Sequence, residues 1–183
     1  TGVASGVPNL ATYDMGGTST DVALIQDGLP TVSTELELEY AMPIHVPMVD
    51  VRTVGAGGGS IARIDAGGML RVGPESAGST PGPVCYGRGG TKVTISDANL
   101  ILGRLPASRF GQAAQAAHQA MEDQIATPLG LSVEAAAEAV IRIANTHMAG
   151  AIRMVSISMG ADPRDFALFA FGGAGPLHAV ALA

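Results

Sequence analysis

The sequence predicts an α/β fold that carries a Gly/Pro-rich insertion of short strands and ordered loops. Three observations lead to this prediction. Strand-like segments with turn signals occupy residues 10–40, helical patterns fill most of the chain from residue 96, and an almost wholly apolar run at 166–171 leads into a glycine loop that opens a helix. With 183 residues, 47% of them hydrophobic and 14% charged, the chain is long enough to bury one sizeable core.

Composition excludes several classes of protein. Ten Lys and Arg against sixteen Asp and Glu give a formal charge of −6, and no basic run occurs, so a nucleic acid partner is not expected. No charge-free run approaches the roughly 18 residues of a membrane span. One cysteine and no signal sequence indicate a soluble protein of the reducing cytoplasm. Because the chain has no initiator Met and ends at Ala183 inside an apparent helix, we also expect it to be part of a longer protein.

Residues 10–40 are expected to form strands. Gly16-Gly17 separates predicted strands at 11–15 and 20–26. Asp27-Gly28 is the strongest short hairpin signal, and it leads to a further extended segment at 31–39. In 35–39 polar and apolar residues alternate strictly, which predicts a strand with one face in water.

Residues 41–95 form a Gly/Pro-rich zone, since twelve of the 25 glycines lie between 55 and 90. Short apolar pieces, at 44–51, 60–64, 69–72 and 92–95, alternate with turn residues. We predict small antiparallel strands and ordered loops here. So many glycines among prolines and apolar residues indicate positive φ angles or a close approach of the backbone to a ligand.

Helices are expected from residue 96 onwards. Ser96 or Asp97 can cap a short helix through residue 102, and a second helix is predicted at 109–124. Ser132 is the expected N-cap of a long helix that reaches about residue 158. Its predicted buried positions follow the i, i+3, i+4 rhythm: Val133, Ala136, Val140, Ile143, Ala144, His147, Ala151 and Met154. The apolar run at 166–171 is predicted to be a strand covered on both faces.

The segment 13–22 places two carboxylates around a glycine turn. Asp14 ends a predicted strand, Gly16 and Gly17 turn the chain, and hydroxyl residues follow before Asp21. Glycines let backbone N–H groups approach an anion and hydroxyls add donors, so the segment can cradle phosphates. A carboxylate beside bound phosphates suits Mg²⁺, which needs only one or two protein oxygens. The same residues also fit a plain hairpin turn.

A second glycine loop at 172–175 follows the apolar run and precedes Pro176, at the start of a predicted helix. A helix N-terminus favours negative charge, but the G-x-G-x-x-G spacing of dinucleotide-binding loops and the G-K-[ST] of a P-loop are both missing. Two glycine loops at strand ends favour a nucleotide held between two lobes. A tight strand-to-helix turn with a helix-face His178 is the alternative.

Other reactive side chains give weaker patterns. His45, Asp50 and Cys85 carry metal-ligand atoms, but no spacing compels a metal site. A lone cysteine such as Cys85 is more often a small buried hydrophobe than a nucleophile. His118 and His147 lie on predicted helices, where core or surface roles are more common than ligation.

The motifs resemble those of the hydantoinase A/5-oxoprolinase family, in unbroken order over residues 10–183. The matching segments are 14–22, 47–51, 54–62, 72–78, 81–90, 96–100 and 170–179. Family members are much longer, so residues 1–183 correspond to a partial hydantoinase A/oxoprolinase domain that begins at the second lobe. Within it, 10–40 form the phosphate-loop strands, 41–95 the glycine-rich region, and 96–183 the helices with the final strand, loop and helix. Arg52 stands where relatives often carry His, which weakens a metal site shared with Asp50 and Cys85.

The resemblance implies an actin-like ATPase (ribonuclease H-like) lobe that uses ATP and Mg²⁺ to open a cyclic amide, of hydantoin or 5-oxoproline type, through a phosphorylated intermediate. The alternatives are a subunit of an ATP-dependent ketone carboxylase or a non-catalytic actin-like nucleotide-binding module. Expected partners are a small cyclic amide or ketone, the remainder of the longer chain, and a hydantoinase B-like subunit. The implied catalytic residues are Asp14 and Asp21, with Asp14 holding Mg²⁺. The implied nucleotide contacts are Gly16, Gly17, Thr18, Ser19, Thr20, Gly172, Gly173 and Gly175.

Overall fold

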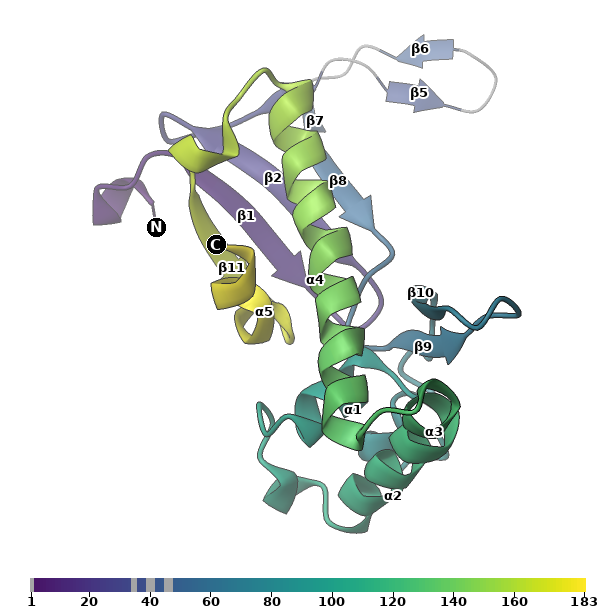
Figure 1. The fold of residues 1–183 in the computed structure, drawn as a ribbon. Helices are drawn as coiled ribbons and strands as arrows, with labels where there is room; N and C mark the ends of the chain where they lie inside the picture. The colour runs from purple at the N-terminus through teal and green to yellow at the C-terminus, as the bar shows by residue number, and fades with distance from the viewer. Residues whose placement is uncertain (1, 34–35, 39–41, 45–47) are drawn as a thin grey trace.

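The computed structural model describes residues 2–33, 36–38, 42–44 and 48–183, and it shows a mixed α/β fold. A sheet crossed by one long helix forms the upper part of the molecule in Figure 1, and a hairpin with shorter helices forms the lower part. The strands are β1 (Leu10–Met15), β2 (Thr20–Gln26), β3 (Leu29–Pro30), β4 (Val32–Ser33), β5 (Leu36–Leu38), β6 (Met42–Ile44), β7 (Met48–Val49), β8 (Val51–Val54), β9 (Ser60–Ile64), β10 (Leu70–Ser76) and β11 (Ala167–Phe171). The α-helices are α1 (Ile95–Ile101), α2 (Gln112–Met121), α3 (Thr127–Leu129), α4 (Val133–Ser158) and α5 (Gly175–Leu182).

The main sheet has the order β11-β1-β2, with β3 and β8 both paired to the outer edge of β2. The β1–β2 pair is the predicted antiparallel hairpin, and Asp27-Gly28 makes the predicted tight turn into β3. The β11 strand runs parallel to β1, and Asp14 lies opposite Phe171. Because parallel strands end at the same edge of a sheet, the loops that follow β1 and β11 are neighbours.

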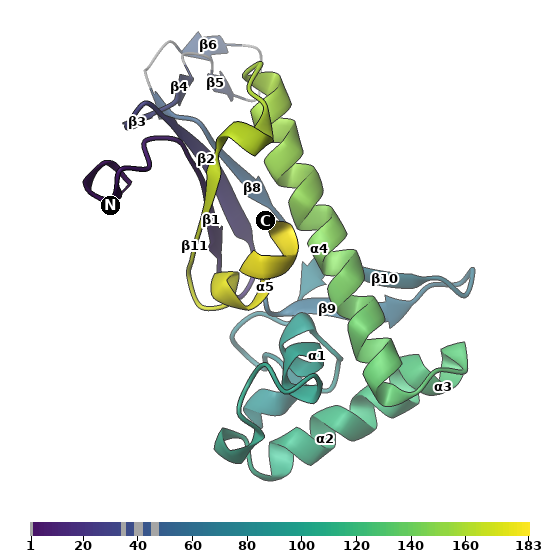
Figure 2. The same ribbon diagram turned by 60° about the vertical axis from the view of Figure 1, so that its left-hand side comes forward.

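One face of this sheet carries the core. Helices α4 and α5 lie on it together (Figure 2), and Tyr13 and Val22 of the sheet belong to the same buried core cluster as Val140 and Met148 of α4. The Tyr13 hydroxyl donates a hydrogen bond to the Met148 sulfur at 2.6 Å, and burial raises the pKa of this phenol. The core therefore binds the centre of α4 firmly to β1.

The prediction that β11 is covered on both faces is wrong for the described chain. Its side chains alternate, so that Leu168 and Ala170 pack against the core while Phe169 and Phe171 stay 38% and 40% exposed. An apolar run on a parallel strand is typical of double burial, but here α4 and α5 both pack on the same face.

The α4 helix begins as predicted, because the Ser132 hydroxyl accepts a hydrogen bond from the Ala135 N–H at 3.2 Å. The predicted buried face is partly wrong. His147 is exposed and Met154 is 71% exposed, and the buried stripe also includes Ala137, Ile141, Met148, Ile152 and Val155. Apolar residues lie around most of the circumference of α4, so periodicity alone does not define its buried face. Packing against the neighbouring elements decides which of these residues are buried.

The α1 helix begins two residues earlier than the first of the predicted caps, Ser96, allows. Thr94 is the N-cap, and Asp97 at the N3 position completes a capping box. The Asp97 carboxylate is fully buried, and it accepts hydrogen bonds from the backbone N–H groups of Val84, Cys85 and Thr94 and from the Thr94 hydroxyl. The α2 helix continues through a π-helical turn (Glu122–Ala126) into α3, so the helical segment extends past the predicted end at 124 to Leu129.

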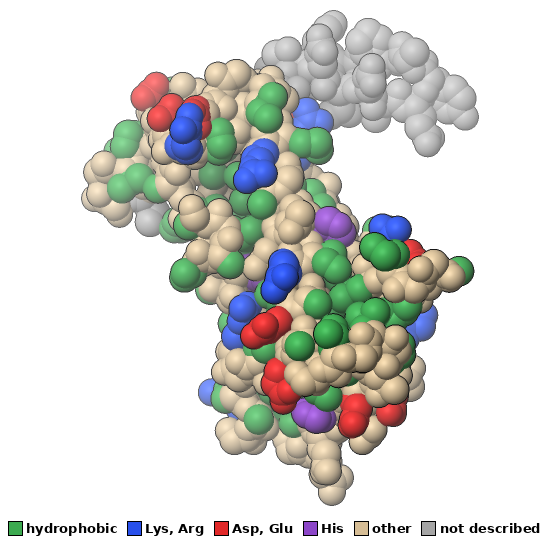
Figure 3. All heavy atoms as spheres, in the orientation of Figure 1, with side chains coloured by type: hydrophobic (Ala, Val, Ile, Leu, Met, Phe, Trp, Pro, Cys, Tyr) green, Lys and Arg blue, Asp and Glu red, His purple; other side chains and the backbone are tan. Residues whose placement is uncertain are grey.

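The Gly/Pro-rich zone is ordered, as predicted, around the antiparallel β9–β10 hairpin. Parts of the predicted segments at 31–39 and 44–51, together with His45 and Pro47, lie outside the described residues. On the face shown in Figure 3, basic side chains are scattered among acidic ones and form no continuous stripe. Within the described ranges, no helix combines the length and apolarity needed to span a membrane.

Candidate functional site

The loop between β1 and β2 presents a row of backbone donors at the carboxyl end of β1. The Gly16 N–H donates to the Ser19 carbonyl at 2.9 Å and closes the turn. The N–H groups of Gly17, Thr18 and Ser19 make no hydrogen bond within the described part of the chain. Gly17 and Thr18 are exposed, and a Cβ at Gly17 would meet nothing within 4 Å. Three successive free donors beside open space fit a phosphate group.

The loop between β11 and α5 lies directly against this turn. The Ala174 N–H donates to the Met15 carbonyl at 3.0 Å. Gly172 has a φ of 82°, and a Cβ there would collide with the Asp14 carboxylate and lie 2.7 Å from the Met15 carbonyl oxygen. Gly173 borders open space, while Gly175 is buried against Tyr13. The close approach of Asp14 therefore requires glycine at 172, whereas a Cβ at Gly175 would make only ordinary contacts, at 3.4 Å or more, with Tyr13 and Met15 of β1.

A third glycine segment completes the cluster, and the sequence reasoning did not include it among the site residues. The Gly58 N–H donates to the Gly16 carbonyl at 3.0 Å, and the Gly59 N–H donates to the Gly17 carbonyl at 2.6 Å. A Cβ at Gly57 would lie 2.6 Å from the backbone of Thr18. The run of three glycines was visible in the sequence, but only the tertiary structure shows that it supports the 16–18 turn.

The predicted hydroxyl residues do not all face the same space. Thr18 is exposed and Ser19 is half-buried, whereas Thr20 is completely buried. The Thr20 hydroxyl donates to the Ala56 carbonyl, so it ties the third glycine segment to β2. The Thr20 side chain therefore points into the core and not toward the open space beside Gly17, so it does not support the predicted nucleotide contact at this residue.

Asp14 and Asp21 lie opposite each other on neighbouring antiparallel strands, on the sheet face away from α4. The Asp21 carboxylate accepts a hydrogen bond from the Thr53 hydroxyl at 2.6 Å. Like charges directly opposite in a ladder destabilise it, and a cation between or beside them removes that repulsion. The pair thus fits Mg²⁺, which binds one or two carboxylates and keeps several waters. No cluster of three or more His, Cys, Asp or Glu side chains occurs among the described residues.

A buried polar network holds the helices behind these loops. His178 of α5 is fully buried, with its Nδ1 atom 2.7 Å from the Asn145 Oδ1 and its Nε2 atom 3.2 Å from the Asn99 Nδ2. The amide partners require a neutral ring that carries its proton on Nδ1. Burial, and less strongly the Arg104 charge, lower the pKa of His178 to about 4. The network joins α5, α4 and α1, so His178 is more than the simple helix-face residue of the alternative interpretation.

The candidate metal ligands outside the turn do not come together. Asp50 forms an ion pair with Arg52, at 3.2 Å from the Arg52 Nε. Cys85 is 1% exposed, and burial together with the neighbouring Asp97 raises the pKa of its thiol. A neutral thiol in the core is a poor metal ligand, so the prediction of a small buried hydrophobe is confirmed and a shared Asp50–Cys85 site is not supported. The third candidate, His45, lies outside the described residues.

A family model described as hydantoinase/oxoprolinase matches residues 1–183, the whole of the sequence. The chain belongs to the hydantoinase/oxoprolinase family. The resemblance of the motifs in the sequence is thereby confirmed.

Relatives in this family include a hydrolase and a carboxylase. The caprolactamase subunit alpha of Pseudomonas jessenii is 50% identical over 97% of this chain and 26% of that protein. The solved ATP-dependent caprolactamase from P. jessenii has a TM-score of 0.87 at 48% identity, over 100% of this chain and 27% of that chain. A nucleotide-free acetone carboxylase, solved in a study of ATP-dependent acetone carboxylation, has a TM-score of 0.86 at 38% identity, over 99% of this chain and 26% of that chain. The chain thus spans about a quarter of the length of these hydantoinase/oxoprolinase relatives.

Proposed function

We propose that this chain is the phosphate-binding part of an ATP-dependent enzyme that opens a cyclic amide through a phosphorylated intermediate. One observation carries the proposal. Three glycine segments, from loops far apart in the sequence, meet where the parallel strands β1 and β11 end: the 57–59 segment bonds to the 16–17 turn, and Gly172 lies against Asp14. Ligands of α/β sheets bind outside the carboxyl ends of the strands. The ATP-dependent relatives named above agree with this assignment.

In this proposal the residues of the 16–19 turn and of the 172–175 loop have different roles. The free N–H groups of Gly17, Thr18 and Ser19, with the Thr18 hydroxyl, contact the phosphates. Gly16 contributes the closed turn, because its own N–H is already bonded to Ser19. Gly172 and Gly173 form the second nucleotide-facing wall, and Gly175 holds that wall against β1. In this proposal the chain is one lobe of an actin-like ATPase fold, and the nucleotide lies between it and a second lobe.

Asp14 holds Mg²⁺ in this proposal, and Asp21 lies beside it as the second carboxylate. Bound ATP supplies the phosphoryl group that activates an otherwise inert amide oxygen. Phosphoryl transfer needs chiefly positioning and neutralisation of charge, which backbone donors and two carboxylates that hold a cation can supply without a strong base. The Asp14 carboxylate lies against Gly172, in space that the Cβ of any other residue at 172 would occupy.

The proposal is tested with Asp14→Asn and Asp14→Ala in the full-length protein. ATP hydrolysis dependent on 5-oxoproline, hydantoin or caprolactam should fall at least about a hundredfold, since removing one main charge-stabilising group costs about 10²–10³ in rate. Asp162→Asn is the matched control, because Asp162 is an exposed carboxylate paired with Arg164 outside the site. Turnover that is equal in Asp14→Asn and Asp162→Asn would refute the assignment.

A second candidate function is a subunit of an ATP-dependent ketone carboxylase, favoured by the structural similarity to acetone carboxylase. The two chemistries share activation by phosphorylation and differ in what attacks next, water or a carboxylating partner. ATP hydrolysis that requires a ketone and bicarbonate together would support the carboxylase. Because the caprolactamase relative is one subunit of a larger enzyme, a hydantoinase B-like partner should be present in either assay. ATP hydrolysis indifferent to every cyclic amide and ketone would instead indicate a non-catalytic nucleotide-binding module.

A further inference from the structure

A cavity lies between the end of β8, the β9–β10 hairpin and the middle of α4. Its volume is about 720 Å³, within the range of small-molecule sites. Val54, Val72, Pro74 and Ile143 contribute apolar wall, and Arg63, Asp65 and Arg71 contribute charge. Such a mixture of apolar wall and a few charged groups is typical of a site for a small amphipathic molecule.

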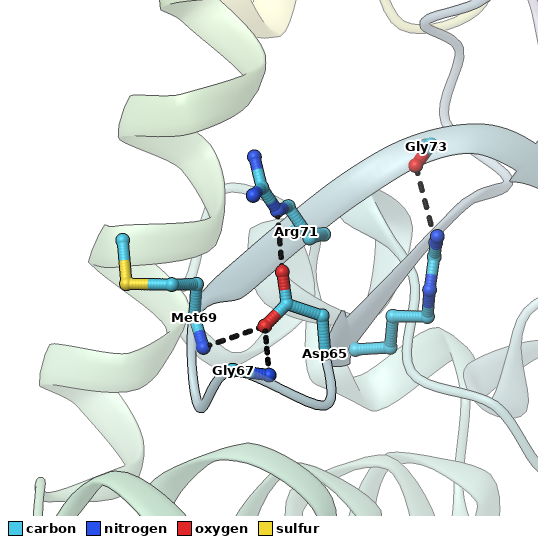
Figure 4. A network of polar contacts seen from close by, with 6 residues as sticks. Asp65, Gly67, Met69, Arg71 and Gly73 are labelled. Atoms are coloured by element: carbon cyan, nitrogen blue, oxygen red, sulfur yellow. Dashed lines mark hydrogen bonds and ion pairs between the residues drawn. The ribbon is translucent and has the colours of Figure 1, made fainter.

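The charges at this cavity do not cancel. Arg63 and Arg71 are direct cross-strand neighbours in the β9–β10 ladder, an arrangement that is unfavourable for two like charges. Asp65 compensates Arg71, because its carboxylate lies 2.8 Å from the Arg71 Nε. The same carboxylate accepts the N–H groups of Gly67 and Met69, both at 3.0 Å (Figure 4). These three donors leave little capacity for a second arginine.

Arg63 is therefore the uncompensated charge. It is half-buried, and its hydrogen bond within the described residues goes to the neutral carbonyl of Gly73 at 3.2 Å, drawn in Figure 4 as the dashed line that ends at Gly73. No described carboxylate lies within ion-pair distance of Arg63. A guanidinium has five donors in a planar fork, which matches a carboxylate in bidentate geometry. Arg63 thus places one uncompensated positive charge beside the apolar wall of the cavity, although the chain as a whole has a net charge of −6.

We propose that this cavity binds a small organic carboxylate, with the carboxylate on Arg63 and the apolar body against Val54, Val72 and Ile143. One unpaired guanidinium balances one negative charge, and the apolar wall disfavours inorganic phosphate, which carries more charge and no apolar body. The proposal is independent of the proposed function, since it concerns binding without ATP.

The first test uses two probes that share one ring. L-5-oxoproline carries a carboxylate, and 2-pyrrolidinone is the same ring without it. Calorimetric titration of the full-length protein, without nucleotide, should show at least tenfold tighter binding of 5-oxoproline than of 2-pyrrolidinone. Equal affinities, or no binding of 5-oxoproline at millimolar concentration, would overturn the proposal. Inorganic phosphate that binds more tightly than 5-oxoproline would overturn it as well.

The second test changes the arginines. Arg63→Met should remove the preference for 5-oxoproline and leave the affinity for 2-pyrrolidinone unchanged, whereas Arg63→Lys should retain part of the preference. Arg52→Met is the matched control, because Arg52 is an exposed arginine outside this cavity. A preference that survives in Arg63→Met is the contrary result. Asp14→Ala should keep the preference while it loses ATP binding, so the failure of one proposal is distinguishable from the failure of the other.

Discussion

Gly172→Ala is the most direct test of the contact between the loop after β1 and the loop after β11. Alanine at a φ of 82° costs about 1–2 kcal/mol, because the Cβ crowds its own carbonyl in the left-handed region. The Cβ also collides with the Asp14 carboxylate and the Met15 carbonyl oxygen, and such overpacking costs about 1–3 kcal/mol. Loss of glycine freedom in the unfolded chain returns about 0.4–1 kcal/mol. The free energy of unfolding should therefore fall by about 1–5 kcal/mol.

Gly173→Ala is the matched control, one residue away. Gly173 has no positive φ, and a Cβ there meets nothing within 4 Å, so alanine should leave the stability unchanged or raise it by up to about 1 kcal/mol. Urea denaturation measures both variants. A Gly172→Ala protein as stable as Gly173→Ala would refute the reasoning.

The same substitution should also disturb function, because the nearest atom to the new methyl group belongs to Asp14. A displacement of about 1 Å at a positioned group can lower a rate about a hundredfold. A double-mutant cycle separates the two effects. If the collision is with the carboxylate, Gly172→Ala should cost at least about 0.5 kcal/mol less in an Asp14→Gly background. An identical cost in both backgrounds would place the strain elsewhere.

Two further predictions follow from the buried titratable groups. The pKa of His178 is about 4 in the folded protein and about 6.5 when unfolded, so the unfolded chain binds the proton first and stability should fall by up to about 3 kcal/mol as the pH drops from 6.5 to 4. His178→Gln should lose this part of the slope in denaturation curves measured at several pH values; an unchanged slope would exclude His178 as its source. Cys85 is the single cysteine, so Ellman's reagent at pH 8 should label the protein only as fast as it unfolds. Complete labelling of the folded protein within seconds would contradict the burial of this thiol.

Local features of the sequence predicted the elements that depend on neighbouring residues. Asp27-Gly28 specified its own turn, and Ser132 capped α4, because both effects act within three residues along the chain. The buried face of α4 and the half-exposed β11 were mispredicted, because both depend on which elements pack against which faces. His147 fits the apolar rhythm of the helix, yet it lies outside the core.

The turn at residues 16–19 illustrates the same division at the candidate site. The position of Asp14 at a strand end, followed by two glycines, already predicted a phosphate loop. The sequence could not show that Thr20 points into the core, since alternation along β2 assigns a face only once the partner layer is known. Nor could it show that Gly58 and Gly59 hold the turn through hydrogen bonds to Gly16 and Gly17.

The sequence by itself determined the α/β class, the strand-end glycine loops and the membership of the hydantoinase/oxoprolinase family, because each of these is a property of residues in order along the chain. Only the tertiary structure decided which loops meet. Parallel pairing of β1 with β11 brings Gly172 onto Asp14 across more than 150 residues of chain. A third segment then closes on the same turn. Such a close contact is possible only where the residue has no Cβ. The sequence shows which residue is a glycine, but it does not show which distant residue packs against that glycine.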